Sequence, residues 1–156
     1  MNHKENHQSN YPKFALMMLT SFVMMYGIMF LNVFKLDHIY LSTTRTYMTL
    51  LMVAPMAISM LLFMWKMYSS IKINYAIIGG AALVFVLALW GLRQQKPIED
   101  ISWMKAMIPH HSSAILTSSN ADFKDPEVKK LAEEIIKAQE REIAEMKAMI
   151  KRLENK

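Results

Sequence analysis

The sequence predicts an all-α membrane protein in which three transmembrane helices are followed by an antiparallel helical hairpin. Two observations carry this prediction. Three apolar windows, 14–34, 47–65 and 75–92, contain no charged side chain, and a helix of about 20 such residues crosses the hydrocarbon core of a bilayer. Most of the charged residues lie instead in 93–156, where apolar residues recur with helical periodicity.

These patterns divide the chain into three parts. Residues 1–13 are polar and predict a disordered N-terminal tail, in which His3 and His7 are lone imidazoles. Residues 14–92 form the predicted transmembrane region, and 93–156 form the predicted soluble hairpin. The first window is longer than the apolar core of a signal peptide, and no small-residue cleavage motif follows it. We therefore expect the first helix to be retained.

Composition limits the possible partners. The chain has 156 residues, a net charge of +5 and no cysteine, which excludes disulfides and thiolate metal sites. Lysine and arginine flank the predicted spans, where they suit anionic lipid headgroups, and nothing resembles a nucleic-acid footprint. We expect a lipid bilayer as a partner and no nucleic acid. The positive residues divide equally between the two sides of the predicted spans, so charge alone does not orient the chain.

The C-terminal part predicts two helices, at about 98–119 and about 126–154. Asp125 supplies an N-cap oxygen for the second helix, and Pro126 occupies its first position, where a missing N–H costs nothing. The short connection makes the pair antiparallel. A hairpin of this size buries too little apolar surface to be stable alone. We therefore expect it to pack against the spans or to complete a four-helix bundle with a second copy.

The first helix of this hairpin carries two adjacent histidines beside two methionines. Pro109 should kink the helix just before His110 and His111, because proline cannot donate to the preceding turn. With Ser118 placed opposite Val128, the polar inner face of the second helix meets these side chains. In that register, His111 is level with Ile135, Met107 with Gln139, and Met104 with Glu142.

Two interpretations of this cluster stay open on residue chemistry alone. In the first, Gln139 and Glu142 hydrogen-bond a buried His111, and the methionines only fill the core. In the second, the cluster holds a metal. Thioethers and imidazole are soft, neutral ligands that favour Cu(I) over zinc, magnesium or calcium. The candidate metal ligands are then Met104, Met107, His110, His111 and Met146, with Gln139 and Glu142 orienting the imidazole behind them.

A resemblance to a known family adds to this second interpretation. The stretch "MIPHHSSAILTSSN" followed by "DPEVKKLAEEIIKAQEREIAEMKAMI" resembles the DUF305 family over about residues 98–153. The matching positions are Met107, His110, His111 and Ala114 in the first helix, Asp125, Pro126 and Val128 before and in the start of the second, and Gln139, Glu142, Ile143 and Met146 further along it.

The resemblance implies a ferritin-like helical bundle, and some members of that family are associated with copper binding. It also implies a bacterial inner (plasma) membrane location, with the hairpin outside the cytoplasm and the N-terminus inside. Members of the family usually have a signal peptide or a single anchor. Three spans and one hairpin depart from that pattern.

The second apolar window has a methionine ladder, which permits a further function. Met48, Met52, Met56, Met60 and Met64 recur at four-residue spacing, so the ladder winds slowly around a helix. It either packs beside Pro55 as adaptable apolar filling or conducts Cu(I) across the bilayer as in a copper transporter.

The sequence therefore predicts a membrane-anchored protein that binds Cu(I) for sequestration or for hand-off to copper-handling proteins. A metal-free membrane assembly module is the alternative, and a copper transporter is a third possibility. We do not expect an enzyme, and no catalytic or organic-cofactor residues are assigned. The chain has no nucleophile–base pattern, no phosphate-binding loop and no paired Glu-x-x-His motifs.

Overall fold

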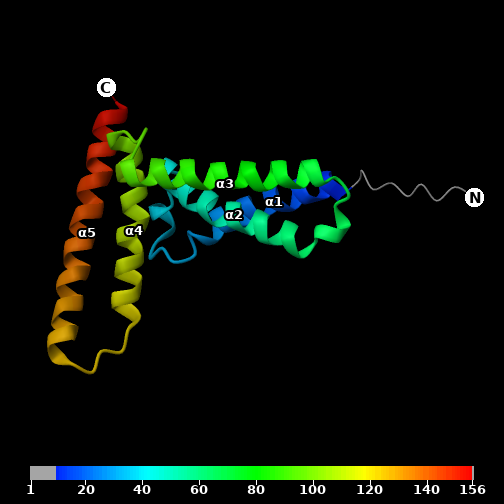
Figure 1. Cartoon of the computed structure of the whole chain (residues 1–156). Coiled ribbons are helices and arrows are strands. Elements are labelled where there is room, and N and C mark those ends of the chain that lie inside the picture. Colours follow the sequence, from blue (N-terminus) through cyan, green and yellow to red (C-terminus); the bar gives the residue numbers. More distant parts are fainter. Residues whose placement is uncertain (1–9, 156) are drawn as a thin grey trace, which may run out of the picture. The chain divides into compact units, whose positions relative to one another are not determined.

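A computed structural model describes residues 10–155 of the chain, and within them every regular element is a helix. The all-α prediction is confirmed. The helices form two compact units, one containing Thr46–Lys96 and the described residues up to Gly27, and the other containing Ile28–Arg45 and the residues from Pro97 onward. Figure 1 shows the elements of each unit in sequence colours.

The first unit contains most of helices α1 (Asn10–Ile28) and α2 (Thr43–Phe63) and all of α3 (Ile71–Gln94), with a short 3₁₀ turn, η3 (Trp65–Met67), between the last two. Its core is formed by Phe14, Ala57, Leu61 and Tyr68. A polar cluster lies beside this core, where the Tyr11 hydroxyl donates to Oδ1 of the fully buried Asn74 over 2.9 Å. The buried amide is satisfied, so it costs little to hold inside an apolar unit.

Two helices of the described chain, and not three, are long and apolar enough to cross a membrane. These are α2 and α3, and the prediction of a third such helix at 14–34 is wrong. The helix in that window ends at Ile28 and extends in the other direction over Asn10–Lys13, which are mostly polar. Its uncharged part, 14–28, is therefore about 22 Å long, whereas the hydrocarbon core is about 30 Å thick.

The N-terminal boundary also differs from the expectation. Of the predicted disordered tail 1–13, residues 10–13 form the first turn of α1. Residues 1–9, with His3 and His7, lie outside the described part of the chain.

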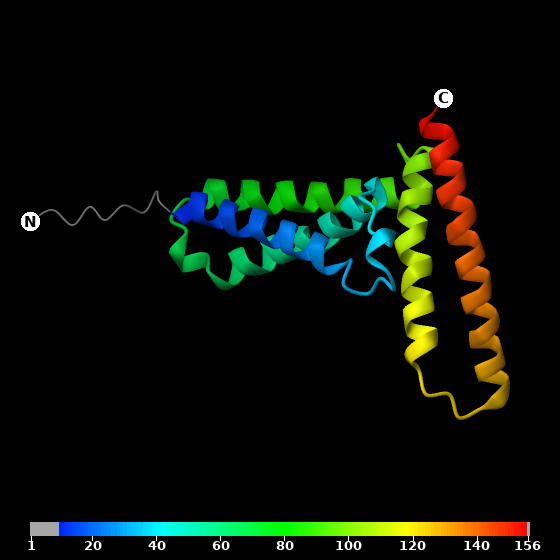
Figure 2. The same ribbon diagram turned by 180° about the vertical axis from the view of Figure 1, so that it is seen from behind.

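The second unit contains helices α4 (Asp100–Asn120) and α5 (Pro126–Glu154), which lie side by side and antiparallel in Figures 1 and 2. The Asp125 side chain accepts the backbone N–H groups of Glu127 and Val128, as expected of an N-cap. Helix α4 continues through Pro109, which is fully buried. Residues 28–45, which we call the strap, belong to the same unit and include the 3₁₀ turn η2 (Leu36–His38).

The register of the hairpin differs from the one predicted. His111 lies 3.1 Å from Glu142 and not beside Ile135, two turns earlier on α5. The predicted register closed the hairpin at Val128, but Val128 and Leu131 are exposed. Apolar burial decides the register instead, because the core lies nearer the open end of the hairpin. That core consists of Met104, Ile108, Ile115, Ile143, Met146 and Ile150.

Ile108 is fully buried in this core, whereas Leu131 on the same hairpin is 56% exposed. Replacing Ile108 by Ala should lower the free energy of unfolding of this unit by about 2–5 kcal/mol, because the lost side chain leaves a cavity. Leu131→Ala should change it by only about 0.5 kcal/mol. Denaturant unfolding followed by circular dichroism checks both values. Equal losses in the two variants would contradict this placement of the core.

Candidate metal site on the helical hairpin

The three methionines predicted as ligands share one cluster. Met104 on α4 and Met146 on α5 are buried members of the hairpin core, with 4% and 6% of their surface exposed. Met107 is half-buried and packs against the same core. The fold therefore brings together thioether sulfurs from both helices, as the candidate site requires.

His111 lies at the edge of this cluster and faces α5. Its Nδ1 is 3.1 Å from Oε2 of Glu142. The atom is buried, but the carboxylate lies out of line for a hydrogen bond, so Nδ1 has close electrostatic contact without a well-directed partner. Burial lowers the pKa of His111, the charge of Glu142 opposes this effect, and His110 adds to it. The imidazole is thus held toward its neutral form, which is the form that binds metals.

A second pair of residues faces across the hairpin one helical turn from the His111–Glu142 contact. Met107 precedes His111 by four residues on α4, and Met146 follows Glu142 by four residues on α5. Residues four apart lie on one face of a helix. Since His111 and Glu142 are level, Met107 and Met146 are also level, one turn along. Two thioethers, one imidazole and one carboxylate therefore lie on the facing sides of the hairpin.

The other two predicted residues are placed less favourably. His110 is exposed, with its ring centroid 6.0 Å from that of His111. Gln139 is half-buried, and Glu142 rather than Gln139 is the residue beside Nδ1 of His111. Within residues 10–155, no three side chains of the histidine, cysteine, aspartate or glutamate types gather as a possible metal site. A metal at this hairpin therefore depends on methionine sulfur.

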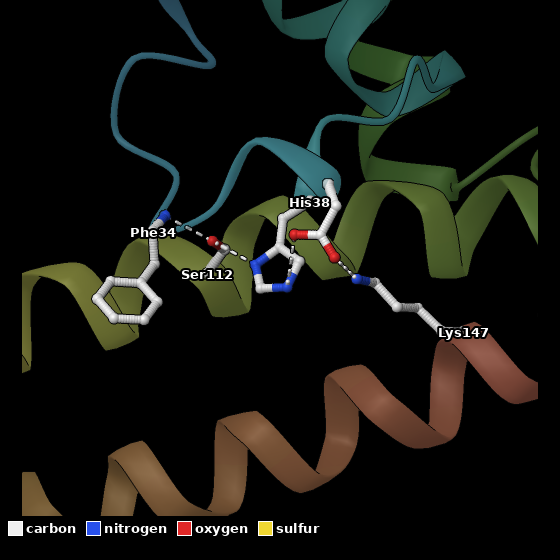
Figure 3. A network of polar contacts seen from close by, with 5 residues as sticks. Phe34, His38, Ser112 and Lys147 are labelled. Atoms are coloured by element: carbon white, nitrogen blue, oxygen red, sulfur yellow. Dashed lines mark hydrogen bonds and ion pairs between the residues drawn. The ribbon is translucent and has the colours of Figure 1, made fainter.

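The strap supplies a second group of polar residues that the sequence did not indicate. Ser112 is fully buried on α4, and its Oγ accepts the backbone N–H of Phe34 over 2.7 Å and contacts Nδ1 of His38 at 2.8 Å. The Asp37 carboxylate binds Nζ of Lys147, on α5, at 2.6 Å. Figure 3 shows these contacts bridging the strap to both helices. The partners are far apart in sequence, and no local pattern connects them.

A cavity of about 240 Å³ lies beside this network. Its polar lining comes from Lys35, Asp37 and His38 of the strap and from Glu140 and Lys147 of α5. The apolar lining consists of Phe34, Ile115, Ile143 and Ala144. The cavity is therefore lined by Asp37, His38 and Lys147 of this network.

Ser112, His38 and Asp37 are the residue types of a hydrolase triad, but their geometry does not form one. Serine hydrolases place the serine on Nε2 of the histidine and the aspartate on Nδ1. Here Ser112 is on Nδ1, and Asp37 is 3.7 Å from Nε2, too far for a hydrogen bond. Ser112 is also fully buried. The three residues therefore fasten the strap and do not form a nucleophile.

Comparison with known proteins finds a family match over the part of the chain that contains the helical hairpin. Residues 89–156 match the family described as "Domain of unknown function (DUF305)". The chain is also 35% identical over 153 residues to the uncharacterized protein L153 of Acanthamoeba polyphaga mimivirus, covering 94% of this chain and 98% of that protein. No solved structure matches the chain.

The chain is therefore a helical protein with a DUF305 domain in its C-terminal part, as its motifs predicted. It belongs to the same family as the mimivirus protein. The similarity to L153 extends through the apolar helices as well as the hairpin.

The surroundings of His111 predict two pKa changes of opposite sign. Glu142→Gln should lower the pKa of His111 further, because it removes the charge that stabilises the imidazolium. His110→Gln should raise it, because it removes a repelling positive charge. Titration of the imidazole proton resonances by NMR measures both shifts. Glu145→Gln is the matched control, because Glu145 pairs with Arg141 on α5, and it should leave the pKa of His111 unchanged.

Proposed function

We propose that this protein is a membrane-anchored metal-binding protein whose α4–α5 hairpin binds Cu(I) for sequestration or hand-off. One observation carries the proposal: the 3.1 Å approach of His111 to Glu142 puts Met107 level with Met146 on the facing helices. Two thioethers and an imidazole are a donor set that prefers Cu(I).

The residues have distinct roles in this proposal. His111, Met107 and Met146 are the primary ligands. Met104 is the better candidate for a fourth ligand, because it lies in the same buried cluster, whereas His110 is exposed. Glu142 orients the imidazole of His111 and offsets the charge of the bound cation.

The membrane part of the proposal rests on α2 and α3. Only 28% of the apolar window of α2 and 11% of that of α3 is buried within the chain, whereas the core helix of a water-soluble protein is mostly buried. A bilayer crossed by these two helices leaves the strap and the hairpin on one side, and these are the segments that pack together as one unit. We place the hairpin outside the cytoplasm of a bacterial cell, as the family resemblance implies.

We further propose that the hairpin pairs with a second copy. Val128 and Leu131 on α5 are exposed apolar residues beyond the hairpin core. A second hairpin covering them would complete a four-helix bundle and remove this apolar surface from water.

Copper affinity tests the site directly. Purified full-length protein is titrated with Cu(I) against a competing chelator, alongside the Met107→Leu/His111→Ala/Met146→Leu variant. The variant should bind at least about tenfold more weakly, which is a loss of about 1.4 kcal/mol or more of binding free energy. Met149→Leu is the matched control, because Met149 is an exposed methionine of the same helix. Equal affinity in wild type and triple variant would refute this site.

The metal-free assembly module is the alternative, and the His111–Glu142 pair also favours it. A carboxylate alone can partner a partly buried imidazole, and methionine is ordinary core filling. Metal analysis of protein from copper-supplemented cells separates the two functions.

The methionine ladder of α2 has no uniform environment: Met48 and Met52 are exposed, whereas Met60 and Met64 pack against the core of the first unit. This favours packing over a copper-conducting track.

A further inference from the structure

The strap contacts both helices of the hairpin. Besides the contacts that follow, Asn32 donates to Ser113 and Thr43 accepts from Ser102, both on α4, and Tyr40 packs against the hairpin core. On α4, Ser112 holds both Phe34 and His38 of the strap. On α5, Lys147 holds Asp37. Ser112 directly follows His111, and Lys147 directly follows Met146. The contact to Ser112 therefore lies beside the His111–Glu142 pair, whereas the contact to Lys147 lies about one turn further along α5, beside Met146.

The first of these fastenings buries an imidazole. His38 is 6% exposed. Because Oγ of Ser112 already accepts the N–H of Phe34, its own proton is available to donate to Nδ1 of His38. We therefore assign the neutral ring with its proton on Nε2. A proton on Nδ1 would turn this acceptor into a donor, and the hydroxyl hydrogen of Ser112 would lose its partner. It would also place a positive charge on a ring that is buried from water, which costs free energy.

We propose that the part of the strap around His38 is a pH-sensitive clasp, closed on α4 at neutral pH and released from Ser112 when His38 takes up a proton. The proposal does not rest on metal binding. It assigns a regulatory role to this part of the strap, where His38 lines the cavity.

The charged groups around His38 do not compensate for the cost of burying its protonated ring. Asp37 is the nearest carboxylate, but it is bound to Lys147. Lys35 on the strap and Lys147 on α5 both repel an imidazolium, Ser112 on α4 is uncharged, and Glu140 lines only the cavity. Burial, the largest effect, and the two lysines lower the pKa of His38, against the opposing charge of Asp37.

The sign of the pH dependence follows from these effects. The free strap has a histidine with an ordinary pKa near 6.5, and the closed strap has one with a lower pKa. Between these two values the open form binds more protons, so acid favours opening. Closure is fully favoured above about pH 6.5 and is lost progressively as the pH falls below it. The Asp37–Lys147 pair persists to more acidic pH, because Lys147 lowers the pKa of Asp37.

Hydrogen exchange of the full-length protein in detergent tests the clasp. Amide protection of residues 30–40, corrected for the intrinsic pH dependence of exchange, is measured between about pH 8 and about pH 5. We expect protection to fall roughly tenfold for each pH unit between the ordinary pKa of histidine and the lower pKa of His38 in the closed strap. The midpoint should coincide with the titration of the His38 imidazole followed by NMR. His111→Gln and His110→Gln are matched controls on α4, and both should retain the transition.

His38→Gln removes the titrating group and should abolish the transition, whether it leaves the strap closed or open. Three results would overturn the proposal: unchanged protection of residues 30–40 over the whole range in the wild type, a transition that survives in His38→Gln, or one that disappears in His111→Gln. A fall in protection along α2 and α3 at the same midpoint would also overturn it, since that would indicate global unfolding instead of local release.

Discussion

The packing of α4 against α5 through six buried apolar side chains is the constraint on which the second unit depends. These residues, Met104, Ile108, Ile115, Ile143, Met146 and Ile150, form one buried cluster in the observed register. That register brings His111 to Glu142 and leaves Val128 exposed. The polar contacts of the hairpin are therefore consequences of where its apolar residues lie, because burial contributes more free energy than surface ion pairs do.

The same packing explains why the methionines are hard to interpret from their chemistry alone. Met104 and Met146 satisfy the core as apolar side chains, and a thioether needs no partner to be buried. His111 is different, because an imidazole nitrogen excluded from water needs a hydrogen-bond partner, a neighbouring charge or a metal. Whether the hairpin binds a metal therefore depends mainly on the imidazole of His111 and its contact with the carboxylate of Glu142.

Sequence periodicity predicted the helices of the hairpin well because their signals are local. Asp125 and Pro126 define the start of α5, and an amphipathic pattern runs to its end at Glu154. The register could not be predicted from the length of the connection, since the two helices pack best away from it. The third membrane-length helix was also mispredicted. The absence of charge in 14–34 indicated an apolar segment, but it did not reveal that the chain turns after Ile28.

The contacts of the strap with α4 and α5 could not be predicted from local sequence patterns. "KLDHIYLSTTR" is an ordinary polar connection until its fold brings it to α4 and α5. His38 and Ser112 are 74 residues apart, and neither residue is distinctive in its own segment. Only tertiary structure makes one imidazole buried and gives one hydroxyl two strap contacts. The motif residues of the family and the residues that fasten the strap are consequently neighbours in space, although only the former were evident in sequence.

The second unit is assembled from two pieces of chain that α2 and α3 separate. During synthesis, His38 leaves the ribosome 74 residues before Ser112, a delay of roughly 4 to 15 seconds at ordinary translation rates. Over that interval the strap has no hairpin to bind, while the two apolar helices between its partners are being made. The final closure must then join distant segments and bear the entropy of a long loop, so docking of the strap is expected to be the last step in the maturation of the chain.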